Sequence, residues 1–194
     1  MFIRICKIRT SGLYQIAVSQ KNLLCRVVFY QVSISATATM SAPIVRTRYG
    51  ALKGTVVQNV EGGEYLAFNG IPYAEPPVGQ LRFKEPQPPK AWSGIRDARK
   101  EGSAAIQVNT MRPTSEIIGS EDCLYLNVST NSLSGKRAVM VWIHGGAFAM
   151  GTGSSDLYGP DYLLKHDIVF VSIYYRLHVL GFLNVDDEEA AGNQ

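Results

Sequence analysis

The residues best suited to chemistry are His144, Gly145, Gly146 and Ala147, which directly follow a strongly apolar run. Glycines carry no side chain, so the backbone N–H groups of such a loop are able to point toward an incoming oxygen atom. N–H donors held about 3 Å from a developing negative charge form an oxyanion hole, which stabilises the transition state of acyl transfer. Because paired glycines are also common in ordinary turns, the alternative interpretation is a simple strand-terminating loop.

The other groups that acyl transfer requires do not form a recognisable motif in the 194 residues. The nucleophile normally lies in a Gly-x-Ser-x-Gly elbow, and the sequence contains no such pattern. His144 belongs to the loop motif, His166 ends a predicted helix, and His178 has no predicted role. The cysteine and histidine spacings do not match a metal site, so no metal and no cofactor are expected.

Two apolar runs are expected to form the strands that position this loop. Residues 138–143 read AVMVWI and residues 168–174 read IVFVSIY, and such runs are typical of strands covered on both faces. Between them, residues 160–166 begin with proline and favour a short helix. This order predicts a right-handed crossover within a mixed or parallel sheet. Residues 124–128 predict a further strand.

Upstream residues predict smaller β elements and a rigid loop. Residues 44–58 favour a short hairpin, residues 61–64 a turn, and residues 65–71 another strand. Between residues 72 and 93, six prolines exclude regular helix and central strand. Apolar side chains are interleaved with these prolines, which indicates a packed loop rather than a flexible linker.

The positive charge of the sequence is concentrated in residues 1–39. This leader carries five basic residues and no acid, whereas the rest holds 14 basic and 16 acidic residues, a net charge of −2. A nucleic-acid-binding function therefore loses its main support. The leader is predicted to be disordered or an artefactual extension upstream of Met40, and the alternative is a mitochondrial transit peptide. No apolar run is long enough to cross a bilayer, so no membrane partner is expected.

Cysteine usage indicates a reducing compartment. Cys6 and Cys25 lie in the leader, so Cys123 is the single cysteine of residues 40–194. A lone cysteine has no partner in that region, and it is more often a small buried hydrophobe than a reactive thiol. The expected location is the cytoplasm, with mitochondria as the alternative if the leader is a genuine transit peptide.

Four ordered blocks of sequence resemble the type-B carboxylesterase family, which includes cholinesterases, juvenile hormone esterases and insect α-esterases. The blocks are FNGIPYA with PPVG and LRF at 68–83, SEDCLYLNV at 120–128, VWIHGG at 141–146, and YRL with LGFL at 175–183. The resemblance extends from about residue 44 to residue 194 at the family's spacing. The stretch DLYGPDYLLK at 156–165 leans toward the insect α-esterases.

The resemblance implies an α/β fold, specifically the N-terminal part of an α/β-hydrolase fold. Its sheet would be mixed and mostly parallel, and a small β-hairpin region would precede it. Residues 1–39 would lie outside this unit, and residues 40–194 would form the N-terminal part of a carboxylesterase domain, truncated before the nucleophile elbow. The serine, acid and histidine of catalysis are expected downstream.

Carried over position by position, the resemblance implies roles for five residues. Gly146 and Ala147 would supply two oxyanion N–H groups, and Gly145 would let the loop fold. Ala147 replaces a commoner third glycine, and its methyl group predicts a preference for smaller acyl groups. Arg82 and Glu121 would form a buried structural salt bridge, whose disruption should be strongly destabilising.

The resemblance also identifies a missing disulfide. The family usually has a cysteine that bridges to the position of Cys123, and in the segment at 102–107 Ala105 occupies the place of that cysteine. Cys123 is therefore expected to be a free thiol. This departure is consistent with an intracellular esterase.

The family implies a serine esterase that hydrolyses carboxylic esters through an acyl-enzyme, as detoxification enzymes do. Its partner would be a small-molecule carboxylic ester in the full-length form, with no nucleic-acid or membrane partner. The 194 residues alone are expected to be inactive. The alternatives are a non-catalytic neuroligin-type adhesion relative and an inactive fragment that binds esters or organophosphates. The sequence predicts neither the substrate nor the oligomeric state.

Overall fold

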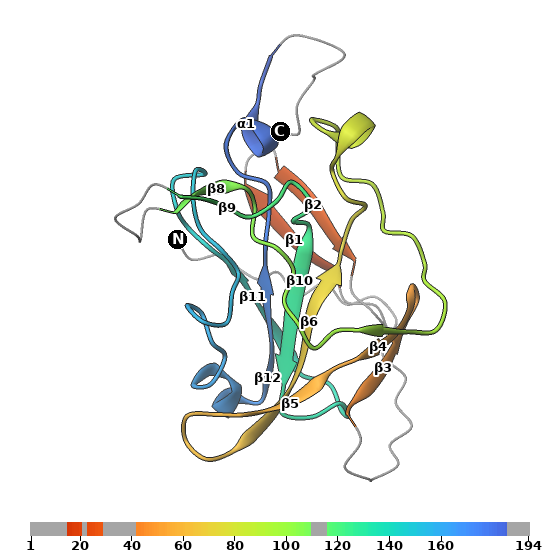
Figure 1. Cartoon of the computed structure of the whole chain (residues 1–194). Coiled ribbons are helices and arrows are strands. Elements are labelled where there is room, and N and C mark those ends of the chain that lie inside the picture. Colours follow the sequence, from red (N-terminus) through yellow and green to blue (C-terminus); the bar gives the residue numbers. More distant parts are fainter. Residues whose placement is uncertain (1–14, 21–22, 29–41, 110–115, 186–194) are drawn as a thin grey trace.

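The computed structural model describes residues 15–20, 23–28, 42–109 and 116–185, and its main feature is a five-stranded sheet (Figure 1). The strand order is β11-β12-β10-β6-β5. The strands are β5 (Thr55–Gln58), β6 (Glu64–Pro72), β10 (Tyr125–Thr130), β11 (Ala138–Ile143) and β12 (Ile168–Ile173). The four strands that the sequence predicts for this sheet are present as β6, β10, β11 and β12, each within two residues of its predicted bounds.

The sheet is mixed, as predicted, but most of its neighbouring strands are antiparallel. β11 and β12 pair in parallel, whereas β10 is antiparallel to both β12 and β6, and β5 is antiparallel to β6. The prediction of a mostly parallel sheet is therefore wrong for the described residues. A parallel pair needs a crossover of a dozen or more residues, which β11 and β12 have, whereas the tight turn after β5 forces antiparallel pairing.

The crossover between β11 and β12 contains a 3-10 helix in place of the predicted short helix. This element, η2, spans Leu163–His166. The carbonyl of Pro160 accepts hydrogen bonds from the N–H groups of Leu163 and Leu164, which begins the helical turns. Asp167 then adopts a left-handed conformation, with φ of 51°, and ends the helix immediately before β12. His166 is thus the last helical residue, as predicted.

The two apolar strands differ in their burial. Five of the six residues of β12 are buried, whereas β11 alternates between exposed and half-buried residues. β12 lies between β11 and β10, but β11 is an edge strand of the described sheet and has fewer side chains around it. The prediction that both strands are covered on both faces is correct for β12 and wrong for β11, where Met140 and Trp142 are each 39% exposed.

A three-stranded sheet contains the predicted hairpin. β3 (Ile44–Thr47) and β4 (Gly50–Lys53) are antiparallel, and β7 (Ile95–Asp97) pairs in parallel with β4. The last residues of the predicted hairpin do not join it, because β5 pairs with β6 in the main sheet. Leu52 of β4 packs with Phe68 and Val171 of the main sheet in one buried cluster, so the two sheets share a core.

The proline-rich stretch is an ordered loop, as predicted, and contains one short 3-10 helix, η1 (Gly79–Leu81). Trp92 near its end donates its backbone N–H to the Tyr49 carbonyl at 2.7 Å and its indole N–H to the Ala51 carbonyl at 2.8 Å. These bonds fix the end of the loop against β4.

Two small elements complete the region around the candidate site. β8 (Gln107–Asn109) and β9 (Glu116–Ile118) form an antiparallel hairpin. The helix α1 (His178–Phe182) follows β12, near the end of the described chain (Figure 1). None of the helices in the described residues has the length and apolar character needed to cross a membrane.

Within residues 1–39, the structure describes one pair of strands. β1 (Gln15–Gln20) and β2 (Leu23–Val28) form a two-stranded antiparallel sheet. The disorder predicted for residues 1–39 stays a prediction, because most of these residues lie outside those that the structure describes. Cys6 and Met40 lie outside the described residues, so the expectations of an artefactual extension and of a transit peptide rest on sequence alone.

Candidate functional site

The loop at 144–151 follows β11 and folds into a compact ring. Gly151 at its end lies against His144 and Gly145 at its start, because a methyl group added to Gly151 would clash with both. A methyl group added to Gly146 would clash with the Met150 carbonyl oxygen across the ring. Gly146 and Gly151 have φ of 126° and 127°, a region that side chains rarely adopt. Glycine is therefore required at both positions.

Gly145, which the sequence predicts to let the loop fold, shows no steric need for glycine. A methyl group added to Gly145 meets no atom within 4 Å, and its φ does not lie in the left-handed region. The backbone freedom that the ring requires is seen at Gly146 and Gly151, where an added methyl group would clash with backbone atoms across the ring.

The two predicted donors, Gly146 and Ala147, lie in a run of left-handed backbone. Gly146, Ala147 and Phe148 have φ of 126°, 52° and 59°. The Gly146 carbonyl accepts hydrogen bonds from the N–H groups of Ala149 at 2.9 Å and Met150 at 3.0 Å. Among the hydrogen bonds between described residues, none uses the N–H of Gly146 or Ala147. Successive N–H groups in such a turn form a concavity suited to an anion.

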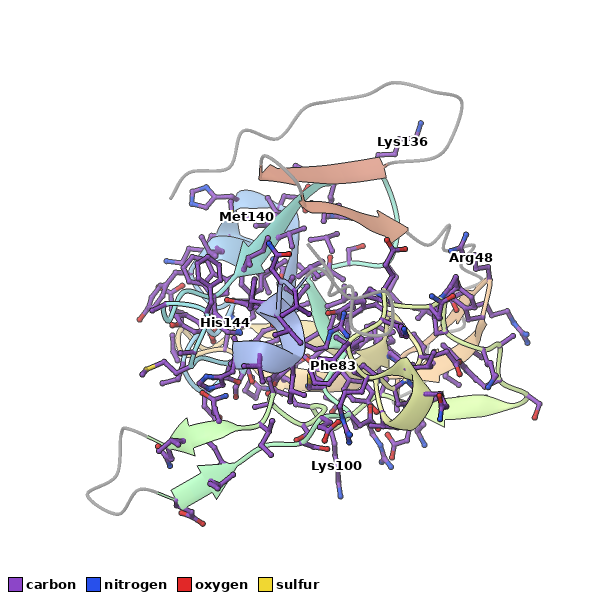
Figure 2. All side chains as sticks on the ribbon, turned by 90° about the horizontal axis from the view of Figure 1, so that it is seen from above. Arg48, Phe83, Lys100, Lys136, Met140 and His144 are labelled. Atoms are coloured by element: carbon purple, nitrogen blue, oxygen red, sulfur yellow. The ribbon has the colours of Figure 1, made fainter. Side chains whose placement is uncertain are left out.

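His144 is buried at the start of the ring and is braced by Tyr175. The two rings stack with centroids 4.3 Å apart, and Tyr175 Oη donates to the His144 carbonyl at 2.6 Å. Burial lowers the pKa of His144 below its ordinary value, which favours the neutral imidazole. Figure 2 shows the labelled His144 beside the C-terminal ribbon. The residue positions the ring rather than presenting a charge.

His178, for which the sequence predicts no role, holds the far side of the ring through its backbone. Its N–H donates to the Phe148 carbonyl at 2.8 Å, and its own φ of 55° is left-handed. The Phe148 ring also packs on Phe182 of α1, with centroids 4.7 Å apart. Sequence patterns do not indicate the contacts of Tyr175 and His178, since one uses a hydroxyl group and the other uses the main chain.

Arg82 and Glu121 form the predicted ion pair through two hydrogen bonds, Nε to Oε2 at 2.6 Å and Nη2 to Oε1 at 2.9 Å. The pair joins the proline-rich loop to the segment before β10. The Arg82 side chain is 44% exposed and the Glu121 side chain 28%. The prediction of a buried pair is therefore wrong. The strong destabilisation expected on breaking it loses its support, because solvent screens exposed pairs.

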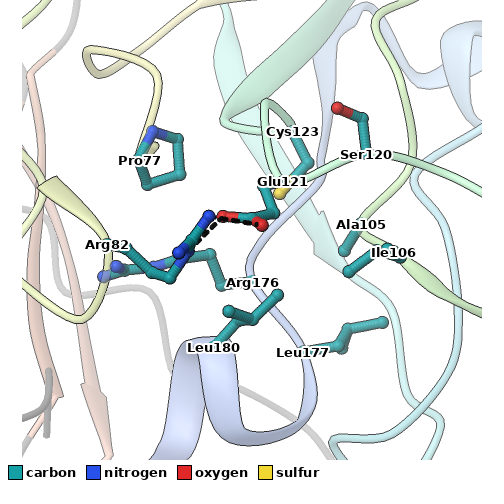
Figure 3. Close-up of a pocket in the computed structure, with 10 residues that line it drawn as sticks. All are labelled: Pro77, Arg82, Ala105, Ile106, Ser120, Glu121, Cys123, Arg176, Leu177 and Leu180. Atoms are coloured by element: carbon teal, nitrogen blue, oxygen red, sulfur yellow. Dashed lines mark hydrogen bonds and ion pairs between the residues drawn. The ribbon is translucent and has the colours of Figure 1, made fainter. Parts of the chain in front are cut away.

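A second feature is a cavity of about 10 Å³ beside Cys123 (Figure 3), room for a single water molecule. Cys123 is a free, buried thiol, as predicted, and burial raises its pKa to about 12. Ala105 is also buried and lines the same cavity, where the resemblance places the missing cysteine. The residues that line this cavity do not include any residue of the 144–151 loop.

Arg176 also lines the Cys123 cavity and is only 6% exposed. Nη1 donates to the Lys84 carbonyl at 3.0 Å, whereas Nη2 has no hydrogen-bond partner within the described part of the chain. Burial lowers the pKa of the Arg176 guanidinium from its ordinary value. The described residues contain no group of three or more His, Cys, Asp or Glu that could hold a metal ion.

Comparison with known proteins gives consistent matches. The model described as "Carboxylesterase family" matches residues 41–194. The chain is 45% identical to a juvenile hormone esterase of Tribolium castaneum, over 80% of this chain and 27% of that protein. It is 39% identical to an acetylcholinesterase of Electrophorus electricus, over 88% of this chain and 29% of that protein. A carboxylesterase structure from Geobacillus stearothermophilus superposes with a TM-score of 0.66 at 44% identity, over 76% of this chain and 30% of that chain.

The matched region includes the 144–151 loop, the Arg82–Glu121 pair and the Cys123 cavity. This chain spans less than a third of the length of each of these relatives. The structural likeness is accompanied by 44% sequence identity, so fold and sequence agree. The chain therefore belongs to the carboxylesterase family, and its mixed sheet is part of an α/β-hydrolase fold.

Proposed function

We propose that the protein containing this chain is a serine esterase that hydrolyses carboxylic esters, with the N–H groups of Gly146 and Ala147 as oxyanion-hole donors. One observation carries the proposal: both N–H groups lie in a run of positive φ and donate to no acceptor within the described residues. Donors held ready in this way stabilise a developing charge without further reorganisation. The names of the relatives, which are esterases, support the reaction class.

In the proposed mechanism, a serine attacks the ester carbonyl and forms a tetrahedral intermediate. The oxyanion of this intermediate accepts hydrogen bonds from Gly146 and Ala147. The 194 residues contain no Gly-x-Ser-x-Gly elbow, so the proposal assigns the serine, the base and the acid to residues outside them. His144 is not assigned as the base, because its ring is buried and stacked on Tyr175.

The direct test is ester hydrolysis by the complete protein. It should hydrolyse p-nitrophenyl acetate, and a trifluoromethyl ketone should inhibit it by forming a tetrahedral adduct on the serine. A folded preparation that neither hydrolyses the ester nor binds the ketone would overturn the proposal. That result would favour a non-catalytic relative instead.

The proposal includes a preference for smaller acyl groups. Ala147 is exposed, and glycine at this position would keep the N–H and accept the φ of 52°. Ala147→Gly should therefore raise kcat/KM for a bulky branched ester by up to about tenfold relative to acetate, because one methyl group is removed beside the acyl pocket. Paired measurements with p-nitrophenyl acetate and pivalate test this, and an unchanged ratio of the two would contradict it.

We also propose a reducing compartment, with the cytoplasm as the location. The support is the free thiol of Cys123, which faces the same cavity as Ala105 and not a second cysteine. Imaging of the complete protein with and without residues 1–39 tests the location. Mitochondrial import that depends on residues 1–39 would support the transit-peptide alternative.

A further inference from the structure

Gln107, the first residue of β8, is a buried polar side chain that the proposed reaction does not use. It is 8% exposed. Its Oε1 accepts a hydrogen bond from the Gly151 N–H at 2.7 Å, and its Nε2 donates to the Gly151 carbonyl at 2.8 Å. One side chain therefore binds both polar backbone groups of Gly151, the residue that closes the 144–151 loop.

A third hydrogen bond fixes the orientation of the Gln107 amide. Nε2 also donates to the Ala105 carbonyl at 3.0 Å. The reversed amide would place Oε1 against two carbonyl oxygens, so the network determines which atom faces which group.

The base of the Gln107 side chain is anchored as well. The Ile106 N–H donates to the Ser120 carbonyl at 3.1 Å, and the Ser120 N–H donates to the Ala104 carbonyl at 2.9 Å. Ala105 and Ser120 form an isolated bridge between the same two segments. Gln107 therefore extends from a fixed segment toward the loop, across a sequence separation of 44 residues.

The position of Gly151 determines the shape of the ring. Gly151 lies against His144 and the Gly145 carbonyl, so its displacement would separate the two ends of the loop. The N–H groups of Gly146 and Ala147 lie between those ends. Such donors are effective only near their productive geometry, where a displacement of about 1 Å can cost on the order of 100-fold in rate.

We infer that Gln107 is a positioning residue for ester hydrolysis: its amide holds Gly151 and thereby keeps the Gly146 and Ala147 donors aligned with the transition state. This inference rests on the proposed function. Because the donors act mainly on the transition state, the loss of Gln107 should lower kcat and leave KM nearly unchanged.

The sharpest test is Gln107→Glu in the complete esterase. A carboxylate at this position would face the carbonyls of Gly151 and Ala105, whereas a protonated carboxyl group would again donate a hydrogen bond to one of them. With p-nitrophenyl acetate at pH 8, we expect kcat to be at least tenfold below the wild-type value. The ratio of variant to wild-type kcat should then rise as the pH is lowered toward 5.5.

Two further variants complete the test, one without the hydrogen bonds and one as a control for the added charge. Gln107→Met keeps the approximate volume and removes all three bonds, so kcat should be lower by at least tenfold at every pH. His144 also lies against Gly151, and its protonation can change kcat in both variants. Dividing the pH profile of kcat for Gln107→Glu by that for Gln107→Met therefore removes the contribution of His144. Gln87→Glu is the matched control, because Gln87 is exposed and should tolerate the charge without a change in kcat. The thermal unfolding temperature of each variant, measured over the same pH range, shows whether a lower kcat comes from unfolding or from displacement of the Gly146 and Ala147 N–H groups.

The outcomes separate the inference from the proposed function. A folded Gln107→Met or Gln107→Glu enzyme that works at the wild-type rate would overturn the positioning role and leave the esterase proposal intact. A wild-type protein that neither hydrolyses the ester nor binds a trifluoromethyl ketone would overturn both. A rise in KM that accounts for the whole loss of kcat/KM would also overturn the positioning role, since it reports weaker ground-state binding.

Discussion

The 144–151 loop and the Cys123 cavity are joined by residues 105–107, but they depend on different forces. The loop is defined by its backbone, through positive φ values and hydrogen bonds to main-chain groups. The cavity wall is defined by side chains: buried apolar ones, among which Cys123 and Leu177 are each 1% exposed, and charged ones such as Arg176. Backbone freedom is therefore the sensitive property of the loop, whereas side-chain chemistry and volume are the sensitive properties of the cavity wall.

The largest effect is expected for Gly146→Ala. The new methyl group would clash with the Met150 carbonyl, and φ of 126° is strained for alanine. We expect a loss of unfolding free energy of roughly 2–5 kcal/mol and a fall in esterase kcat on the order of 100- to 1,000-fold. Urea unfolding and ester hydrolysis by the complete protein measure the two effects.

Gly145→Ala is the matched comparison for this prediction. Its methyl group meets no atom within 4 Å, so its unfolding free energy should stay within about 1 kcal/mol of the wild type. Equal destabilisation by the two substitutions would show that the ring does not depend on backbone conformation in the way described.

The next largest effect is a gain in stability expected for Ala105→Cys, a substitution in the wall of the Cys123 cavity. The new thiol would face the cavity that Cys123 lines, so oxidation should close a disulfide across about 18 residues of chain and stabilise the protein by about 3 kcal/mol. Thiol counting and thermal unfolding, with and without reductant, measure this. Two free thiols after oxidation would mean that the cavity separates the side chains too widely.

A smaller effect is expected from the ionisation of His144. Burial lowers its pKa in the folded state, so below the unfolded-state value of about 6.5 the unfolded chain binds more protons. Stability should therefore fall as the pH drops from 7.5 toward 5.5, and His144→Gln should reduce this dependence. Unfolding free energies at several pH values test the prediction, which a variant with the same pH dependence as the wild type would contradict.

The smallest effect is expected for the Arg82–Glu121 pair, which lines the Cys123 cavity but is open to solvent. Both side chains are partly exposed, so the double-mutant cycle of Arg82→Met and Glu121→Gln should give a small coupling that salt weakens further. Urea unfolding at low and high salt provides the measurement. A large, salt-insensitive coupling would restore the interpretation of a buried structural pair.

Local patterns were sufficient to predict several elements of the fold. The apolar runs locate β11 and β12, and the prolines locate the packed loop. Patterns of this kind do not determine which strand is central. β11 and β12 have similar compositions, but only β12 has a strand on each side in the described sheet, so their burial differs for a reason that lies outside their own residues.

The candidate site shows the same limit more clearly. Gly145 and Gly146 are adjacent and chemically identical in sequence, and only the observed φ and the Met150 carbonyl distinguish their roles. The ion pair of Arg82 with Glu121 and the free thiol of Cys123 were predictable from family motifs. The bonds that Gln107, Tyr175 and His178 make to the ring were not, since they join distant segments through amide, hydroxyl and main-chain groups.

The long sequence separation of the contacts around the ring has a consequence for synthesis on the ribosome. Gln107 precedes Gly151 by 44 residues, and Tyr175 follows His144 by 31. A nascent chain that has left the ribosome only as far as the 144–151 loop lacks Tyr175 and His178, which contact the start and the far side of the ring. Closing contacts between such distant segments is slow. We therefore expect a ligand that needs the N–H groups of both Gly146 and Ala147 to bind only chains in which these contacts have formed. Binding of such a ligand would then report that folding is complete.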